Sequence, residues 1–243
     1  MRLHFTFELR NEMVPFDYRR KIISYLKFCM ERSNPNTYQE LYGNGKNNNK
    51  DFAMSVYFVP ETQFYKDYIY VKGKRMVLNL CTTDSCLGIE LYNALCSQKY
   101  VWYKFSDNNE IKLVNIHSEK EKVITGRKAT FNTLSPIVIR DHDRDTGKDW
   151  FYTFEDDMAE SILKRNLKSE LEGKFDRDIG YDIENLQIIP VKMKKVIVSC
   201  YEMKIASSLG VLKIEGEPYL LQYLYQRGLG GKRSLCFGYL ELL

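Results

Sequence analysis

The stretch Arg2-Leu3-His4-Phe5-Thr6-Phe7-Glu8-Leu9-Arg10 alternates between polar and apolar side chains along its whole length. A period of two residues is typical of a strand that buries one of its faces. The apolar face comprises Leu3, Phe5, Phe7 and Leu9, and the polar face comprises Arg2, His4, Thr6 and Glu8. We therefore expect a half-buried β-strand here, and the order of the segments that follow it indicates the fold.

The segments after this strand predict one compact α+β unit. Apolar residues at helical spacing follow Pro15 and end near Asn34-Pro35, and a short helical turn covers residues 37–42. The Gly- and Asn-rich stretch 43–50 predicts an exposed, mobile loop. Strands are then expected at 52–59, 68–71 and 76–81, a helix at 87–97, and strands at 100–105 and 111–116. The order β-α-β-β-α-β is that of the ferredoxin-like motif.

From about Ser118 the same order of segments begins again. Strands are expected at 125–131, 137–140 and 150–153, a helix at 156–172, strands at 185–189, 195–204 and 210–215, and a last strand at 235–243. Before the last strand, Pro218 begins a helix and Gly228 ends it, which is the usual placement of these two residues. We predict an α+β protein with two tandem ferredoxin-like (RRM-type) βαββαβ domains, residues 1–118 and 119–243.

The composition indicates which partners, metal sites and cofactors can be expected. A net charge of +4 permits a polyanionic partner, and 18 tyrosines suit a wet binding surface. The six cysteines form no CxxC pair and only three histidines are present, so we expect free thiols, no metal site and no cofactor. Because no signal-peptide pattern and no apolar run of ~20 residues is visible, we expect a soluble cytoplasmic protein without a membrane partner.

A glycine-rich segment lies near the end of the sequence, Gly228-Leu229-Gly230-Gly231-Lys232-Arg233-Ser234-Leu235-Cys236-Phe237-Gly238. It follows a predicted helix and precedes a strand, whereas a Rossmann or P-loop glycine motif follows a strand and opens a helix. Glycine amides can instead converge on a phosphate, with basic side chains adding charge. The candidate RNA-binding residues are Arg227, Gly228, Gly230, Gly231, Lys232, Arg233 and Ser234. The alternative is a helix C-cap followed by a tight turn with a solvated basic pair.

This segment resembles the C-terminal glycine-rich signature of the Cas6 family of CRISPR endoribonucleases, part of the RAMP superfamily. It matches at Gly228, Gly230, Leu235, Phe237 and Gly238, but Cys236 stands where the family commonly has glycine. The stretch 133–138, Thr-Leu-Ser-Pro-Ile-Val, is similar to the segment that opens the family's second domain. Asn34-Pro35, Glu40-Leu41 and the stretch 50–55 resemble the first domain's helix end and returning strand. The resemblance therefore covers the chain from start to end.

The resemblance implies cleavage of CRISPR repeat RNA without a metal, by attack of a 2′-hydroxyl on the neighbouring phosphate. Tyr42 occupies the position of the family's usual catalytic histidine, although an unperturbed tyrosine titrates near ~10. Lys50 matches an assisting lysine, and Tyr25 lies near the position of a catalytic tyrosine in other members. His4 is a further catalytic candidate on the polar face of the first strand, with an ordinary strand residue as the alternative.

The resemblance implies CRISPR repeat RNA, single-stranded or hairpin, as the partner. Other CRISPR effector subunits and a second copy of the chain, in a homodimer, are further candidate partners. An alternative function is a catalytically weak or inactive repeat-RNA-binding subunit of the same family. A general RRM-type RNA binder is a further alternative, although no RNP-like aromatic motif is visible. Basic clusters at 164–168 and 192–195 are either RNA tracks or solvated surface. We expect a hairpin turn, and no calcium loop, at 141–147.

Overall fold

In the computed structural model, the protein divides into two compact units, Met1–Glu121 and Lys122–Leu243. The structure describes residues 1–43, 50–143, 145–201 and 203–243. The loop expected at 43–50 therefore lies, for residues 44–49, outside the described residues, as does position 144 of the turn expected at 141–147. Within the described ranges, no helix is long and apolar enough to cross a membrane.

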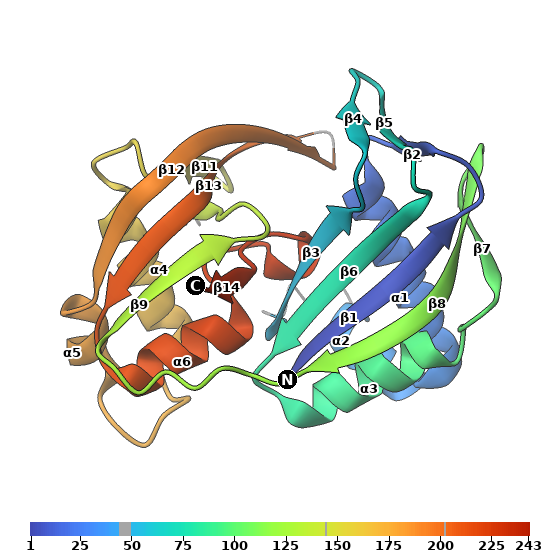
Figure 1. Cartoon of the computed structure of the whole chain (residues 1–243). Helices are drawn as coiled ribbons and strands as arrows, with labels where there is room; N and C mark the ends of the chain where they lie inside the picture. The colour runs from blue at the N-terminus through green and yellow to red at the C-terminus, as the bar shows by residue number, and fades with distance from the viewer. Residues whose placement is uncertain (44–49, 144, 202) are drawn as a thin grey trace. The chain divides into compact units, whose positions relative to one another are not determined.

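The first unit is a five-stranded antiparallel sheet in the order β3-β6-β1-β8-β7 (Figure 1). A second sheet has the order β2-β5-β4. The elements are β1 (Arg2–Leu9), β2 (Met13–Pro15), α1 (Tyr18–Ser33), α2 (Pro35–Tyr42), β3 (Phe52–Phe58), β4 (Thr62–Phe64), β5 (Tyr68–Val71), β6 (Arg75–Thr82), α3 (Ser85–Cys96), β7 (Trp102–Ser106) and β8 (Asn109–Glu119). The succession β1-α1-β3-β6-α3-β8 is the predicted βαββαβ motif, to which the other strands are added.

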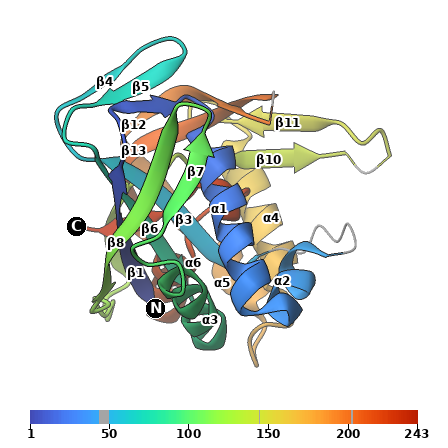
Figure 2. The same cartoon turned by 90° about the vertical axis from the view of Figure 1, so that its right-hand side faces the viewer.

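The alternation in β1 explains how this unit is layered. Leu3, Phe5, Phe7 and Leu9 are at most 1% exposed, and they face the core under the helices. Helices α1 and α3 both lie on this side of the sheet (Figures 1 and 2). Within the first unit, the opposite face of the sheet carries polar and aromatic side chains, as expected for an antiparallel sheet with one covered face.

A single residue joins the first two helices. The backbone N–H of Asn34 donates to the carbonyl of Met30 and closes α1. Its side-chain oxygen accepts a hydrogen bond from the N–H of Thr37 at 3.3 Å, which caps α2, and Pro35 fits the first turn of that helix. The direction of α2, and with it the position of Tyr42 at its end, therefore follows from the Asn34-Pro35 pair.

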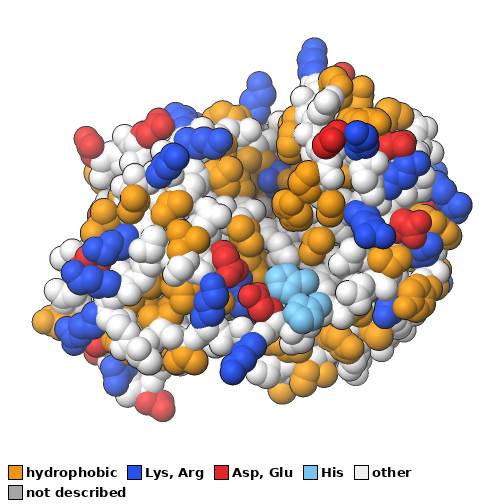
Figure 3. Space-filling model, in the orientation of Figure 1, with side chains coloured by type: hydrophobic (Ala, Val, Ile, Leu, Met, Phe, Trp, Pro, Cys, Tyr) orange, Lys and Arg blue, Asp and Glu red, His pale blue; other side chains and the backbone are white. Residues whose placement is uncertain are grey.

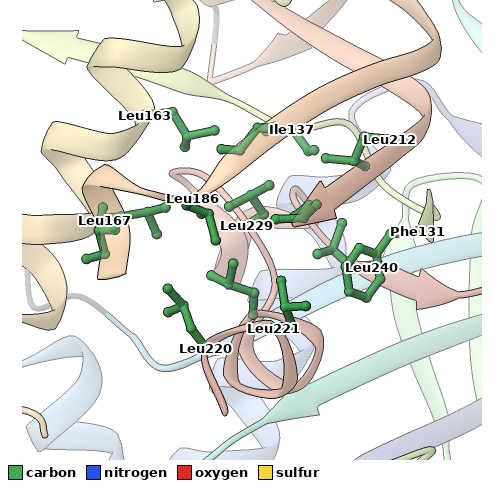
Figure 4. Close-up of a cluster of buried hydrophobic side chains, with 14 of the residues drawn as sticks. Phe131, Ile137, Leu163, Leu167, Leu186, Leu212, Leu220, Leu221, Leu229 and Leu240 are labelled. Carbon is green, nitrogen blue, oxygen red and sulfur yellow. The ribbon is translucent and has the colours of Figure 1, made fainter. Parts of the chain in front are cut away.

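The second unit contains a four-stranded sheet in the order β12-β13-β9-β14 and a two-stranded β10-β11 sheet. Its elements are β9 (Lys128–Thr133), β10 (Ile139–His142), β11 (Asp149–Tyr152), α4 (Ala159–Leu171), α5 (Ile179–Glu184), β12 (Gln187–Cys200), β13 (Met203–Glu215), α6 (Pro218–Arg227), a 3₁₀ turn (Arg233–Leu235) and β14 (Leu240–Leu242). The succession β9-α4-β12-β13-α6-β14 repeats the βαββαβ order, which confirms the predicted fold class. Leucines and isoleucines from the four-stranded sheet and from α4, α5 and α6 fill the larger of the two clusters of buried side chains that the structure describes in this unit (Figure 4).

Several predicted strands of the second unit were wrong in their bounds. The strand predicted at 195–204 runs past the end of β12 at Cys200, and the strand predicted at 210–215 is the end of β13, which begins at Met203. The sequence predicts a break between residues 189 and 195, but β12 runs through Pro190 without interruption. This is tolerated because β12 is an edge strand, where a proline need not donate to a neighbour, and because its register with β13 shifts between Pro190 and Lys192. The strand predicted at 235–243 is shortened to β14, because residues 229–238 bond to the chain before β10.

Candidate functional site

Two lysines and a tyrosine form a positively charged site in the first unit. The Lys27 ammonium, on α1, lies 4.7 Å from the centre of the Tyr42 ring at the end of α2. The Lys50 ammonium, just before β3, lies 4.8 Å from the same ring. Tyr38, one turn earlier on α2, has its ring centre 5.8 Å from that of Tyr42. The structure therefore brings the predicted residues Tyr42 and Lys50 together and adds Lys27 to them.

The electrostatics of this site favour an anion. A tyrosine ring attracts cations through the electron density of its face, which helps to hold two ammonium groups near each other. Burial lowers the pKa of Lys50, and the positive charge of Lys27 lowers it further. An anion placed beside both ammonium groups would relieve their mutual repulsion. A phosphate group of a nucleic acid has the charge and the hydrogen-bond acceptors for this position.

Tyr25 does not take part in this site. Its ring is 1% exposed and packs edge-on against Phe7 and Tyr103, with ring centres 5.5 Å and 4.9 Å apart. Burial, followed by the neighbouring Cys29, raises the pKa of its hydroxyl well above the ordinary value. The prediction of Tyr25 as a catalytic group is therefore corrected to a core residue, because the helical spacing that places it near Lys27 turns its side chain inward.

His4 lies on the sheet face opposite the helices, away from α1 and α2. Its Nδ1 is 2.7 Å from Oδ1 of Asn79, and its Nε2 is 3.0 Å from Oε2 of Glu119. The Asn79 amide nitrogen donates to Ser55, so the asparagine oxygen is left to accept from His4. Both ring nitrogens of His4 thus lie within hydrogen-bonding distance of side chains of its own unit. This arrangement corrects His4 from a catalytic base to a hydrogen-bonding residue of the sheet surface.

The backbone of the glycine-rich segment is bound to its own unit. The N–H of Leu229 donates to the carbonyl of Gly238, that of Gly231 to Val138, and that of Gly238 to Pro136, each at 2.8 Å. These amides therefore do not form the phosphate-binding concavity that the sequence suggested. The glycines serve the close packing of backbones instead: Gly238 has φ +67°, and a Cβ there would overlap the Leu229 carbonyl oxygen.

Cys236, which replaces a family glycine, adopts a left-handed conformation with φ +61°. Glycine adopts this conformation more readily than other residues, and glycine is what the resemblance described above implies at this position. The neighbouring Lys232 also has a positive φ, at +55°. The segment is thus a tight structural turn, of which Gly230, Gly231, Lys232 and Ser234 remain partly exposed.

Two of the three basic residues in this segment are internal. Arg227 is fully buried and Arg233 is 5% exposed, and both pair with the carboxylate of Glu170 on α4. Arg233 binds the two carboxylate oxygens at 2.7 Å and 3.2 Å. Burial raises the pKa of Glu170, but the charges of Arg233 and Arg227 outweigh it and hold the pKa below its ordinary value. These arginines were predicted as RNA ligands, and the structure corrects them to partners of Glu170.

Lys232 is the basic residue of the segment that reaches the surface. Its ammonium lies 5.8 Å from the centre of the Phe151 ring on β11. Burial lowers the pKa of Lys232, and the nearby charge of Arg140 lowers it further. Asp149, which pairs with Arg140, opposes this lowering of the pKa. As the basic residue of the segment at the surface, Lys232 keeps the role of a candidate phosphate contact.

The other basic clusters differ in their surroundings. The three basic residues of α4 each pair with an acidic side chain: Lys164 with Glu160 at 2.7 Å, Arg165 with Asp141 at 2.7 Å, and Lys168 with Glu184 at 2.9 Å. The positive charge of this cluster is therefore largely neutralised within the protein. On the edge strand β12, the side chains of Lys192, Lys194 and Lys195 are exposed. In the described part of the chain, no group of three or more His, Cys, Asp or Glu side chains is arranged to hold a metal ion.

Two residues that matter to these sites were not predicted from the sequence. They are Lys27 and Glu170. The spacing of Tyr38 and Tyr42 is a usable signal, since residues four apart share a helix face and mark the side of α2 that meets a neighbour. No comparable local signal exists for Glu170, because its two arginine partners are more than fifty residues away in the sequence.

Comparisons with known proteins agree on one family. The profile of the family described as CRISPR associated protein Cas6, C-terminal, matches residues 119–242, just over half of the 243-residue chain. A curated relative is the putative CRISPR-associated endoribonuclease-like protein Cas6nc of Pyrococcus horikoshii, which is 29% identical over 123 residues. That match spans 49% of this chain and 49% of the relative, about half of its length.

Solved structures support the same conclusion at the level of the fold. One is described as the characterization of a Cas6-related gene from Pyrococcus furiosus; it has a TM-score of 0.85 at 19% identity and covers 100% of this chain and 98% of that chain. Another is described as a RAMP protein binding different RNA substrates; it has a TM-score of 0.84 at 20% identity and covers 100% and 99%. Since the family profile spans more than half of a chain with this fold, the protein belongs to the Cas6 family of CRISPR-associated proteins.

Proposed function

We propose that the protein is a metal-independent endoribonuclease that cleaves repeat RNA in CRISPR precursor transcripts at the site formed by Lys27, Tyr42 and Lys50. The observation that carries the proposal is the approach of two ammonium groups to one tyrosine ring, at 4.7 Å and 4.8 Å. Membership of the Cas6 family, and the endoribonuclease-like name of the Pyrococcus horikoshii relative, support a nuclease rather than another class of enzyme.

The reaction needs a proton acceptor, charge stabilisation and a proton donor. The 2′-oxygen forms a bond to the adjacent phosphorus and loses its proton, while the bond from phosphorus to the 5′-oxygen breaks and that oxygen gains a proton. The products are a 2′,3′-cyclic phosphate and a 5′-hydroxyl. We assign the first proton transfer to the neutral form of Lys50, whose pKa is lowered by burial and by Lys27. The Lys27 ammonium stabilises the phosphoryl oxygens. The Tyr42 hydroxyl donates the proton to the leaving 5′-oxygen and regains one from protonated Lys50, which returns Lys50 to its neutral form.

Single-turnover cleavage of the cognate repeat RNA tests this assignment. Lys27→Ala and Lys50→Ala should each slow the reaction about 10²-fold to 10⁴-fold, because each removes one element of acid–base or electrostatic catalysis. Lys66→Ala is the matched control, since Lys66 is an exposed lysine of the same unit. Rates within twofold of the wild type in both lysine variants would contradict the assignment.

A second function is favoured by one feature, the tyrosine at the position of the family's usual histidine. In this alternative the protein binds repeat RNA without cutting it, and the lysines hold a phosphate only. The two functions differ in one result: a binding subunit retains intact RNA at saturating protein, whereas the endoribonuclease converts it. Lys27→Ala and Lys50→Ala would then weaken RNA binding and have no cleavage to slow.

A further inference from the structure

The small sheet of the first unit has an apolar outer face. Its strands β2, β5 and β4 lie at one end of the five-stranded sheet (Figures 1 and 2). The antiparallel register places Met13 opposite Tyr70 and Pro15 opposite Tyr68, and residues opposite each other share a face. Ile69, between the two tyrosines, is buried, so the tyrosines point outward. We call Met13, Pro15, Tyr65, Tyr68 and Tyr70 the small-sheet face.

A stacked pair of tyrosines extends the small-sheet face past the end of β4. The Tyr65 ring centre lies 4.8 Å from that of Tyr68, with an angle of 21° between the ring planes. The Tyr65 hydroxyl donates to the Gln63 side chain at 2.6 Å. Tyr65 and Met13 are 45% and 44% exposed, and Figure 3 shows hydrophobic side chains at this end of the unit. Exposed apolar clusters commonly mark a surface that contacts another molecule.

A pocket of about 370 Å³ opens beside the small-sheet face. Met13, Pro15 and Tyr68 form one wall, and the start of α1 and the turn between β7 and β8 form the others. The buried Asn109 holds these walls together, because its side-chain amide donates to the carbonyls of Met13 at 2.6 Å and of Asn11 at 3.0 Å. Its side-chain oxygen accepts from the N–H of Asn11 at 3.1 Å. The shape of the pocket is therefore set by the fold.

The other walls of the pocket carry an excess of carboxylates. Asp17 lies at the start of α1, Asp67 just before β5, and Asp107 in the turn between β7 and β8. Asp107 pairs with Lys104 at 3.0 Å, and its pKa is lowered by this hydrogen bond and, to a smaller extent, by the charge of Lys21. Within the described part of the chain, Asp17 and Asp67 form no ion pair. Two carboxylates are thus left to meet a cation from outside.

We propose that the pocket and the small-sheet face together bind a basic segment of another protein. A lysine or arginine side chain of that segment enters the pocket and meets Asp17 and Asp67. Its apolar stem packs against Met13, and its charge lies near the face of the Tyr68 ring, which attracts cations. A neighbouring apolar side chain of the same segment covers Tyr65. Arginine and tyrosine are frequent at the centres of protein interfaces, which agrees with this pairing.

The charges favour a protein segment over a nucleic acid at this surface. The phosphates of RNA would lie close to two unpaired carboxylates, which repel them. The residues of the pocket are also distinct from the lysines and the tyrosine to which we assign cleavage. The inference therefore does not depend on the proposed function, and either can fail without the other.

Selection from a random peptide library displayed on phage, with the full chain as the target, tests the proposal. Peptides with a lysine or arginine next to an apolar residue should be enriched by the wild type, and not by the double variant Asp17→Asn, Asp67→Asn. One such peptide is then labelled and titrated. The double variant and Tyr68→Ala should each weaken its Kd about 3-fold to 30-fold, the effect of losing exposed charge pairs or one cation–π contact. Asp157→Asn and Tyr181→Ala, both at exposed positions of the second unit, are the matched controls and should bind as the wild type does.

A charge reversal supplies a readout that a folding defect cannot imitate. Asp67→Lys should lose affinity for the basic peptide, and it should bind the same peptide with glutamate at the basic position more tightly than the wild type does. The proposal is overturned if no basic peptides depend on the two aspartates, or if Asp67→Lys gains no affinity for the glutamate peptide. It is also overturned if Tyr68→Ala weakens the Kd for unstructured RNA, because the surface would then bind nucleic acid.

Discussion

At the scale of single residues, Tyr42 owes its chemical setting to two lysines from distant positions in the sequence. Lys27 comes from α1 and Lys50 from the segment before β3, and each lies within 5 Å of the centre of the Tyr42 ring. A lysine near a second cation, and partly removed from water, is more readily deprotonated than a free lysine. The site can therefore supply a proton acceptor although it has no histidine.

The pH dependence of cleavage tests this role of Lys50. If the neutral amine accepts the proton, the single-turnover rate should rise with pH and level off below the ordinary lysine pKa of 10.5, because the pKa of Lys50 is lowered. Lys27→Ala removes a neighbouring charge, raises the pKa of Lys50, and should move the profile to higher pH. Reactions without protein provide the correction for alkaline hydrolysis. A flat or falling profile would contradict a lysine base.

At the scale of secondary-structure elements, Glu170 ties α4 to the turn that follows α6. It is 13% exposed and holds Arg227 and Arg233, whose side chains are 0% and 5% exposed. The pair of arginines and the carboxylate thus form a buried ionic contact between segments that are far apart in the sequence. The removal of one member of such a contact leaves charge in the interior without compensation.

Glu170→Gln should therefore lower the free energy of unfolding at neutral pH by about 3 kcal/mol, measured by urea denaturation. The folded-state pKa of Glu170 is lowered, so its contribution is present above the unfolded pKa of about 4.5 and is lost as the pH falls through the folded value. The variant should lose less stability on acidification than the wild type. Glu184→Gln, which removes an exposed pair with Lys168, is the control and should cost less than about 1 kcal/mol. Equal effects of the two substitutions would contradict a buried role for Glu170.

At the scale of the whole molecule, the tandem ferredoxin-like fold could be predicted because local patterns specify it. The alternation of apolar residues in β1 and their helical spacing in α1, α4 and α6 indicate which side chains face a core. The course of residues 229–239 could not be predicted, because its backbone N–H groups donate to the carbonyls of Pro136 and Val138, about a hundred residues earlier in the sequence.

The predictions of site residues succeeded or failed for the same reason as the predictions of the fold. Tyr42 and Lys50 were predicted from a resemblance of sequence, and the structure brings the two side chains together. Tyr25, His4, Arg227 and Arg233 carry suitable side chains in suitable segments, but burial and pairing decide their roles, and these depend on partners elsewhere in the chain. The sequence shows which chemical groups are present. The burial and the ion pairs that set the pKa values and the accessibility of these groups arise only on folding.

The central claim is that the protein cuts RNA by attack of the 2′-hydroxyl without a metal ion. The most direct measurement compares cognate repeat RNA with the same RNA carrying a single 2′-deoxy nucleotide at the scissile position, both in excess EDTA. We expect the unmodified RNA to be cut to a 2′,3′-cyclic phosphate and a 5′-hydroxyl, and the 2′-deoxy RNA to stay intact while it still binds. Cleavage of the 2′-deoxy RNA, or a strict requirement for added magnesium, would contradict the claim.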